Sequence, residues 1–468
     1  MPSQTPETPI CFRMQPDRQL LDGKCPVPGC PPRHGVAGES ASGSVVYNIP
    51  PCLMGEQHHT SLGCDGLKRI AVLVNPEPIG SFQDQAWEAV STLRAILRQQ
   101  NEPMSVTVQT VFLSDAANMP AARALFEAYF GDRMPLTSFV IQPPCDGAAL
   151  AIEAWAIGTR TAKVEYLNPD LVTVTYEGIR WIHAGAGCLQ PFGRSAYEQS
   201  IDAFEGMAGM LAEAGASFQD VVRTWLYQGG ITELEGDTER YRELNRARTD
   251  FFAKALTGMR LSARKDGEPL YPASTGIGTL NRGLVTSCLA VQSERKDVQV
   301  ISLENPLQTA AFDYPKEYSM KSPKFSRATA MRMGDYLTTW VSGTASIVDA
   351  LTVHPGDIEK QTDQTLTNIE RLIEAANFER LGWTDAGATL GDLAKLRVYV
   401  KRKEDYEKCR ATCERRVGRT PTIYTIADVC RPDLLVEIEG VAFSPLRKPV
   451  AKPERSQESS CVLSESFR

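Results

Sequence analysis

Two patterns of apolar residues alternate along this chain, and each predicts one kind of secondary structure. In the segment Phe82–Gln100, Trp87, Val90, Leu93 and Leu97 recur at the spacing of one helical face, so we expect an amphipathic helix there. Shorter runs of mostly apolar residues lie between such helical segments. These runs are typical of buried strands, so the chain as a whole is expected to be an α/β protein.

The expected elements recur three times in the same order, which indicates three related units. Each unit reads strand, helix, strand, helix and closing strands, an order typical of a mixed sheet with helices on one face. The first unit is expected at Ile70–Val74, Phe82–Gln100, Val106–Leu113, Ala121–Tyr129 and two closing strands that end at Ile157. The second is expected at Gly178–Gly187, Ala196–Ala214, Val221–Tyr227, Glu239–Ala255, a strand near Gly276 and Gly283–Val291. The third is expected at Tyr336–Gly343, Ile358–Ala376, Leu393–Val400, Asp405–Val417, Thr422–Ala427 and Leu434–Phe443.

These repeats predict the domain organisation of the chain. We expect units at 67–165, 166–304 and 331–446, with a linker over 305–330 that carries pocket residues. The terminal segments 1–66 and 447–468 lack hydrophobic periodicity, and the first of them is rich in proline, glycine and serine. Both are therefore expected to be poorly ordered tails.

The last strand of the third unit differs from its counterparts because it carries a pair of carboxylates. Side chains alternate between the faces of a strand, so Glu437 and Glu439 point one way while Val436 and Ile438 point the other. A carboxyl group among valine, isoleucine and leucine is costly to ionise and tends to stay protonated. An acid in one copy of a repeated scaffold predicts one working site and two supporting units.

Composition and charge narrow the possible functions. The chain has 468 residues, of which 42% are hydrophobic and 23% charged, as in ordinary soluble globular proteins. Its net charge of -7 argues against a nucleic-acid or acidic-membrane partner. We find no run of 18 apolar residues and no secretory signal pattern at the start, so we expect a cytoplasmic protein that acts on a small molecule.

The cysteines were considered as metal ligands. Five of the twelve lie in the first 66 residues, where the motif CPVPGC has histidines nearby. A zinc site is conceivable there, but the absence of a CxxC pair favours free thiols. Cys145, Cys188, Cys288 and Cys430 lie in apolar, strand-like contexts and are expected to be buried thiols. No dinucleotide-binding or catalytic-metal motif is present, so no cofactor is predicted.

The repeated order resembles the Rid (YjgF) superfamily, whose closing strand of the type IEAIA is matched here by IEAWAI and VEIEGVAF. Simple members are homotrimers with sites between subunits, so three units in one chain imply an internal pseudo-trimer around a barrel-like core. Rid enzymes that hydrolyse imines hold the substrate carboxylate with an arginine in the penultimate strand. The matching positions fall near Thr137, Ser274 and Thr422, and none of these residues is arginine.

A narrower resemblance, to the chorismatases, covers about 170–445. The segment NPLQTAAFDYPKEYSMKSPKFSRA (Asn305–Ala328) looks like the linker of these Rid-derived enzymes, which split chorismate. Further matches, in the same order as in the family, are PASTGIG (Pro272–Gly278), SGTASI (Ser342–Ile347), HPGD (His354–Asp357) and ADVCRPDLLVEIEG (Ala427–Gly440). This chain departs from the pattern at Asp349–Leu351, and all or much of an extra unit precedes the usual core.

The chorismatase resemblance implies a reaction and a set of residues. Release of pyruvate from chorismate needs a proton on the enolpyruvyl methylene carbon, and Glu437 occupies the family's acid position. Glu439 is expected to support it, because a nearby carboxylate raises the pKa of its neighbour. The residues expected to bind substrate are Arg327, Tyr314, Tyr318, Ser274, Gly343, Cys430 and, as a weaker candidate, Arg397.

Individual residue types carry parts of this expectation. The planar guanidinium of Arg327 can grip a carboxylate with two hydrogen bonds, and tyrosine hydroxyls can donate to one. Ser274 is expected in a hydroxyl-rich turn whose backbone N–H groups could hold an anion. Gly343 together with Cys430 resembles the subtype that makes 3-hydroxybenzoate rather than a dihydroxycyclohexadiene acid.

Two other functions stay open at this point. One is a Rid-type imine or enamine deaminase, and the other is a non-catalytic ligand-binding protein. The individual residues also have structural alternatives, in which Glu437 is a strand-edge carboxylate paired with a lysine or arginine and Arg327 is a surface arginine at the end of a loop. The sequence leaves the oligomeric state open, as a monomer or a homo-oligomer.

Overall fold

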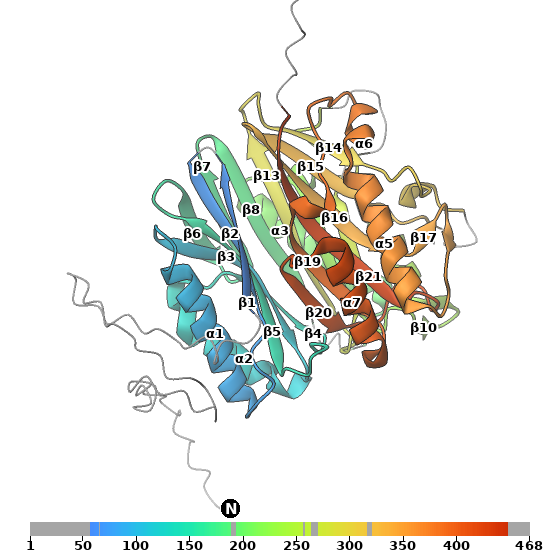
Figure 1. Ribbon diagram of the computed structural model, residues 1–468, viewed down its shortest axis with the longest axis horizontal. Coiled ribbons are helices and arrows are strands. Elements are labelled where there is room, and N and C mark those ends of the chain that lie inside the picture. Colours follow the sequence, from blue (N-terminus) through green and yellow to red (C-terminus); the bar gives the residue numbers. More distant parts are fainter. Residues whose placement is uncertain are drawn as a thin grey trace, which may run out of the picture.

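The structure is a computed structural model that describes residues 57–64, 66–188, 193–255, 258–263, 270–315 and 321–447. Within them the chain forms three large β-sheets, and helices lie on the outer sides of the molecule (Figure 1). The mixed α/β fold expected from the sequence is thereby confirmed.

The first sheet has five strands in the order β1-β2-β5-β3-β4. These strands are β1 (Gln57–Cys64), β2 (Leu67–Val74), β3 (Met104–Leu113), β4 (Leu136–Ile141) and β5 (Leu150–Gly158). Helices α1 (Phe82–Arg98) and α2 (Met119–Phe130) pack on it and form a core with it.

The second sheet has six strands in the order β12-β9-β13-β8-β7-β6. These strands are β6 (Lys163–Asn168), β7 (Leu171–Tyr176), β8 (Ile179–Cys188), β9 (Val221–Gly229), β12 (Ala273–Thr279) and β13 (Leu284–Ser293). Its helices are α3 (Ala196–Glu213) and α4 (Arg240–Ala255), and the short hairpin β10 (Leu234–Glu235) and β11 (Thr238–Glu239) precedes α4.

The third sheet has six strands in the order β14-β15-β16-β21-β19-β20. These strands are β14 (Gln299–Leu303), β15 (Ala328–Met333), β16 (Tyr336–Ala345), β19 (Leu393–Val400), β20 (Thr422–Ile426) and β21 (Val436–Pro445). Its helices are α5 (Ile358–Ile373), α6 (Ala375–Glu379) and α7 (Tyr406–Val417), and a hairpin of β17 (Ile347–Val348) and β18 (Leu351–Thr352) follows β16.

The three sheets share one topology, which confirms the repeated element order. In each, the closing strand lies antiparallel between the first and second strands of the unit, as β5 does between β2 and β3. In each, the second and penultimate strands are parallel, as β3 and β4 are. The corresponding sets are β8, β9, β12 and β13 in the second sheet and β16, β19, β20 and β21 in the third.

The helices begin where the sequence supplies capping side chains. Ser81 and Asp84 form a capping box at the start of α1, and Ser195 and Glu198 form one at the start of α3. Asp357 accepts a hydrogen bond from the Lys360 backbone N–H at the start of α5. These caps satisfy backbone N–H groups that have no partner inside the helix.

The central strands of each sheet are buried on both faces. One face packs under its own helices, and the other packs against the other two sheets. A shared cluster at the centre includes Phe112 from β3, Tyr227 from β9 and Tyr399 from β19, all 0 or 1% exposed. Burial on both faces explains why strands such as β19 read as nearly continuous apolar runs.

Two expectations about the architecture need correction. Within the described residues the three sheets are separate, and the β-pairing outside them is limited to isolated bridges such as Ala273–Ser326, so no closed barrel forms there. The segment 1–66 is not wholly a tail, because β1 pairs with β2 along its whole length. The rest of that tail, its zinc motif, and the tail 447–468 beyond residue 447 lie outside the described residues.

The unit boundaries stay a prediction. Strand pairing, however, assigns two strands to a different sheet from the one expected from those boundaries. Strand β14 lies within the expected second unit at 166–304, yet it pairs with β15 of the third sheet. Strand β6 begins before residue 166 and belongs to the second sheet through β7. These edge strands extend each sheet beyond the basic unit, and the sequence pattern did not predict them because they are short.

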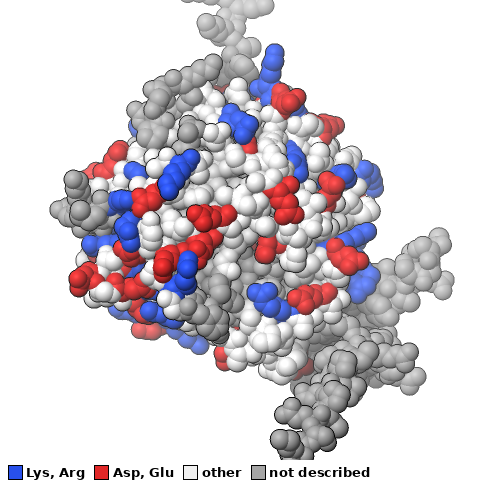
Figure 2. All heavy atoms as spheres, turned by 180° about the vertical axis from the view of Figure 1, so that it is seen from behind, with Lys and Arg blue, Asp and Glu red and all other residues white. Residues whose placement is uncertain are grey.

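The surface is charged in a mixed way. On the face shown in Figure 2, acidic and basic side chains are interspersed, a distribution that does not favour a polyanionic partner there. In the part of the chain that the structure describes, no helix is long and apolar enough to span a membrane.

Candidate active site

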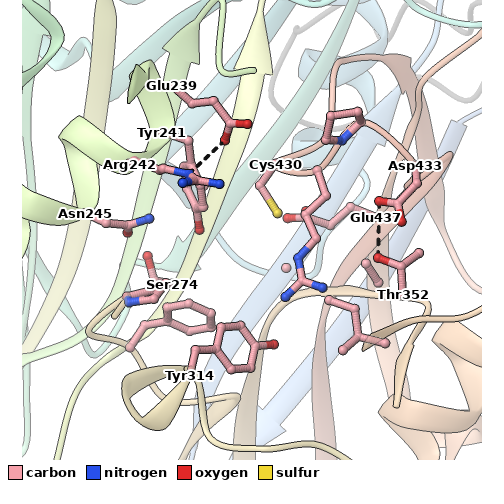
Figure 3. A pocket seen from close by; sticks show the side chains of 18 of the residues that line it. Glu239, Tyr241, Arg242, Asn245, Ser274, Tyr314, Thr352, Cys430, Asp433 and Glu437 are labelled. Carbon is pink, nitrogen blue, oxygen red and sulfur yellow. Dashed lines mark hydrogen bonds and ion pairs between the residues drawn. The ribbon is translucent and has the colours of Figure 1, made fainter. Parts of the chain in front are cut away.

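A cavity of about 530 Å³ lies between the second and third sheets. Helix α4 and strand β12 form one wall, and β16, β21 and the loop before β21 form the other (Figure 3). The residues that line it include Tyr241, Asn245, Arg248, Ser274, Gly276, Tyr314, Phe325, Arg327, Gly343, Cys430, Arg431 and Glu437. Every site residue expected from the sequence therefore lines this cavity, except Arg397 and Tyr318.

Strand β21 places Glu437 in the wall of the cavity. Glu437 is only 4% exposed, and no hydrogen bond or ion pair reaches its carboxyl group from the described residues. Burial and then the charge of Glu439 raise the pKa of Glu437 to about 8, although the guanidiniums of Arg223 and Arg327 act against this. At neutral pH the carboxyl group is therefore protonated and able to donate its proton into the cavity. The alternative of a strand carboxylate paired with a lysine or arginine does not describe Glu437.

Glu439 lies two residues further along the same strand, and its carboxyl group is ionised whereas that of Glu437 is neutral. Its carboxylate lies 2.7 Å from Nη2 of Arg223 and 3.2 Å from Nη1 of Arg397, and it accepts a hydrogen bond from Trp225 Nε1 at 3.1 Å. Burial alone would raise the pKa of Glu439, but the charges of Arg397 and Arg223 outweigh it and lower the pKa. One strand thus carries a neutral and an ionised carboxyl group side by side.

Strand β16 has a bulge next to these two glutamates. The pairing register with β21 shifts between Val341 and Thr344, so Ser342 and Gly343 together lie opposite a single residue of β21. A Cβ atom on residue 343 would lie 1.9 Å from Oε1 of Glu437. Only glycine therefore allows the Glu437 carboxyl group to occupy this position.

Arg327 enters the cavity from the linker and is 3% exposed. Its Nη2 donates to the Tyr314 hydroxyl at 2.5 Å and to the Thr309 carbonyl at 3.2 Å, and its guanidinium lies 5.5 Å from the ring centroids of Tyr314 and Phe325. Its Nε has no hydrogen-bond partner among the described residues, and no carboxylate there forms an ion pair with it. The guanidinium is thus fixed in place with part of its binding capacity unused.

A second buried guanidinium faces the same cavity. Arg248 is 2% exposed and donates to Asn245 Oδ1 and, at 3.3 Å, to Ser274 Oγ. Within the described residues its Nε has no partner and no carboxylate forms an ion pair with it. Burial lowers the pKa of Arg248, but an arginine remains charged at neutral pH. The cavity therefore holds two buried guanidiniums that form no ion pair with a carboxylate among the described residues, although Glu304 lies near Arg327 and raises its pKa.

Helix α4 supplies residues that the sequence analysis missed. Tyr241, Asn245 and Arg248 are spaced so that they lie on one face of the helix. Because α4 also carries charged residues on its other faces, this spacing does not single them out in the sequence. Gly276 allows the Tyr241 ring to approach β12, since a Cβ there would lie 3.2 Å from Cε2 of the ring. Arg431, also missed, lies with its guanidinium 5.3 Å from the Tyr314 ring centroid.

Cys430 faces Glu437 in the cavity (Figure 3). Burial and the nearby Glu437 raise the pKa of the Cys430 thiol to about 12. The group is therefore a neutral thiol and not an activated nucleophile.

Arg397 does not line the cavity, contrary to the expectation of a substrate contact. Its guanidinium donates to Glu153, to the Tyr227 hydroxyl and to Thr110 Oγ1, and it also forms the ion pair with Glu439. All of these groups are buried at the meeting point of the three sheets. An arginine with its donors satisfied in this way has a structural role.

Ser274 lines the cavity, but it is the second residue of β12 and does not lie in a turn, and its backbone N–H donates to Ser342 Oγ at 2.8 Å. A nest of N–H groups for an anion is therefore absent at Ser274. Tyr318 lies outside the described residues.

Comparison with known proteins gives a consistent family. The model for "Chorismatase FkbO/Hyg5-like, N-terminal" matches residues 159–290, which include most of the second sheet. A Streptomyces hygroscopicus protein named 3-hydroxybenzoate synthase is 36% identical over 278 residues, covering 57% of this chain and 77% of that protein. A crystal structure of a chorismatase superposes with a TM-score of 0.56 and 25% identity, covering 72% of this chain and 93% of that one.

The wider resemblance also has a counterpart. A RutC family protein from Pyrococcus abyssi is 27% identical over 131 residues, covering 27% of this chain and 94% of that protein. A relative of about one unit in length agrees with the repeated organisation of the chain.

Proposed function

The chain belongs to the chorismatase family, and on this premise we propose that it is an enzyme that cleaves chorismate to pyruvate and a hydroxybenzoate. The observation that carries the proposal is the pairing of a protonated, unpartnered Glu437 with two buried guanidiniums in one cavity. Chorismate has two carboxylates and one acid-sensitive enol ether, so its charge and its chemistry both match this set of groups.

The first step is a proton transfer to carbon. The O–H bond of the Glu437 carboxyl group breaks, and the π electrons of the enolpyruvyl double bond form a new C–H bond at the methylene carbon. The adjacent carbon becomes an oxocarbenium ion, and the ionised Glu437 carboxylate beside it stabilises that positive charge. Glu439 stays ionised throughout because its cation partners hold it, so only Glu437 exchanges a proton.

The cations have the task of binding and orienting the substrate. Arg327 with Tyr314 holds one carboxylate, and Arg248 with Asn245 holds the other. The charge-assisted hydrogen bonds supply affinity, and the fixed guanidinium planes set the substrate's angle to Glu437. Tyr318, which is proposed from the family resemblance alone, adds a further hydroxyl group.

The product depends on which group traps the oxocarbenium ion. If the ring hydroxyl traps it, that hydroxyl loses its proton and its oxygen bonds to the oxocarbenium carbon. The bond from this oxygen to the ring then breaks, and pyruvate leaves with this oxygen while the original ether oxygen stays on the ring as a hydroxyl group. Loss of the ring hydrogen at that carbon gives 3-hydroxybenzoate without consumption of water. If water traps it, a dihydroxycyclohexadiene acid results. Gly343 and Cys430 shape the side of the cavity next to Glu437, and with the resemblance to a 3-hydroxybenzoate synthase they favour 3-hydroxybenzoate.

We further propose that the three sheets form an internal pseudo-trimer, with this cavity at one of its interfaces, in a cytoplasmic enzyme that needs no cofactor. The common topology and the shared central cluster of the three sheets support the trimer-like arrangement. At the position of Glu437 the first sheet has Ala151, opposite Phe112, and the second has Val285, opposite Tyr227. Only the interface with the acid can therefore do the proposed chemistry.

Incubation of the purified protein with chorismate tests the proposal. Pyruvate is measured with lactate dehydrogenase and NADH, and the aromatic product is identified by chromatography against 3-hydroxybenzoate. We expect equal amounts of pyruvate and 3-hydroxybenzoate. Absence of pyruvate would reject the function, whereas a dihydroxycyclohexadiene product would reject only the subtype.

A further inference from the structure

The Thr275 hydroxyl links two groups of residues. One is the central charge network, which consists of Arg223, Glu439, Arg397, Glu153 and Lys395, and the other is the β16 bulge beside Glu437. Thr275 is 0% exposed in β12, and its methyl group lies 3.2 Å from where a Cβ on Gly343 would be. Its Oγ1 accepts from Arg223 Nη2 at 2.5 Å and from the Gly343 backbone N–H at 3.0 Å, and it donates to Glu439 Oε2. A hydroxyl has one donor and two acceptor sites, so all three are used.

This arrangement fixes the bulge that borders Glu437. In a bulge, an extra residue loses its partner on the neighbouring strand. The Gly343 N–H finds a partner in the second sheet instead, and the neighbouring Ser342 Oγ accepts from the Ser274 N–H in the same sheet. The bulged backbone is thus held by β12, across the interface, while the Glu437 carboxyl group lies directly against Gly343.

We propose that Thr275 is a positioning residue for the reaction, because its hydroxyl fixes the β16 bulge against which the proton-donating carboxyl group of Glu437 rests. Arg223 and Glu439 hold that hydroxyl in one orientation. A shift of the bulge toward the cavity would push the Glu437 carboxyl group away from the substrate carbon. This inference deepens the proposed function and rests on it.

Three variants separate positioning from general stability. Thr275→Val keeps the shape and removes the hydroxyl, whereas Thr275→Ser keeps the hydroxyl and removes the methyl group. Thr329→Val is the matched control. The buried Thr329 Oγ1 in β15 accepts a hydrogen bond at 2.9 Å from the backbone N–H of Ala273, which lies in the same strand as Thr275, but it does not reach the bulge. Both valine variants leave a buried backbone N–H without its partner.

The readout is kcat and KM for pyruvate release, with the folded fraction measured by circular dichroism. We expect kcat of Thr275→Val to fall on the order of 100-fold with little change in KM, because a small misplacement of a reacting group has effects of this size. Thr275→Ser and Thr329→Val should retain kcat. If Thr275→Val has the kcat of Thr329→Val, the proposal is wrong.

A second measurement uses the wild-type protein and does not depend on the folding of any variant. Amide hydrogen exchange should show the Gly343 N–H protected to the same degree as the neighbouring paired residues of β16. Rapid exchange of this amide would overturn the inference. Failure of the wild type to release pyruvate would reject the proposed function instead, and the exchange result would still stand.

Discussion

The interface between the second and third sheets and the interface between the third and first sheets use the same scaffold differently. By strand register, Glu153 of β5 corresponds to Glu439 of β21. Glu153 lies opposite Thr110 of β3, and Glu439 lies opposite Arg397, the residue of β19 that corresponds to Thr110. Glu153 binds Lys395 and Arg397, and these charges hold its pKa at about 2 against the effect of burial. Glu437, two residues before Glu439, has no such partner and stays neutral.

The comparison teaches that burial alone does not make a catalytic acid. Both carboxyl groups are buried among strands, but one has two cations within bonding distance and the other faces a cavity. The first sheet has Ala151 at the position that corresponds to Glu437, so that interface has no acid. The charged groups of that interface pair with each other. A buried charge network then joins three sheets, while the remaining interface keeps its unpaired groups for a ligand.

The largest expected effect follows removal of the acid. Glu437→Gln should lower kcat for pyruvate release on the order of 1,000-fold, because a positioned general acid contributes between about 100-fold and 10,000-fold. Steady-state assays with chorismate measure this. The variant should fold normally, since glutamine resembles the neutral carboxyl group. Wild-type turnover by the variant would contradict the role of Glu437.

A smaller loss is expected when one unpaired cation is removed. Arg248→Gln should lower kcat/KM by about 10-fold to 100-fold, because a hydrogen bond to a charged group contributes about 1.5–3 kcal/mol. The expected change is in KM more than in kcat, and competition assays with a dicarboxylate analogue of chorismate should show weaker binding. Unchanged KM would place the substrate elsewhere.

The central network should respond in stability and not in catalysis. Glu153→Gln removes the carboxylate that pairs with Lys395 and Arg397, and it leaves Lys395 without an ion pair and Arg397 with Glu439 alone. Removal of one partner from a buried ion pair costs about 3–5 kcal/mol. Chemical denaturation should show that loss. The turnover per folded molecule should match the wild type, and a specific loss of kcat would mean that the two interfaces are coupled.

The smallest expected effect is a shift in pH dependence. Activity requires the protonated Glu437, so kcat/KM should fall as the pH rises through about 8. The charged groups that act on Glu437 are Glu439, which raises its pKa, and Arg223 and Arg327, which lower it. Glu439→Gln removes the raising charge and should move this limb to lower pH. If kcat/KM of Glu439→Gln falls at the same pH as that of the wild type, Glu439 does not set the pKa of Glu437.

Much of the fold could be predicted from the sequence, because long amphipathic helices and apolar strands repeat in one order. Strands β6, β7, β14 and β15 were not predicted, because they lie outside the element order that repeats in all three units. Of the site, Glu437 was found through its place in a closing strand, and its neutral state agrees with the apolar neighbours seen there.

Long-range contacts explain what the sequence could not predict. Arg397 and Arg327 are both buried arginines, and only the structure shows that Glu153 and Glu439 satisfy the first while no carboxylate pairs with the second. Arg248 was missed because its role depends on α4 facing β21 across an interface between units. Spacing within one strand or helix does not contain that information.

The protonation state of Glu437 can be measured directly by infrared difference spectroscopy as a function of pH. Burial also raises the pKa of Glu304 to about 7, so the spectrum of Glu437→Gln must be subtracted from that of the wild type. We predict a protonated-carboxyl band in the wild type at pH 6 to 7 that is absent from the variant and disappears with a midpoint near pH 8. If the wild type and the variant have the same band intensity at neutral pH, Glu437 is already ionised and cannot be the proton donor.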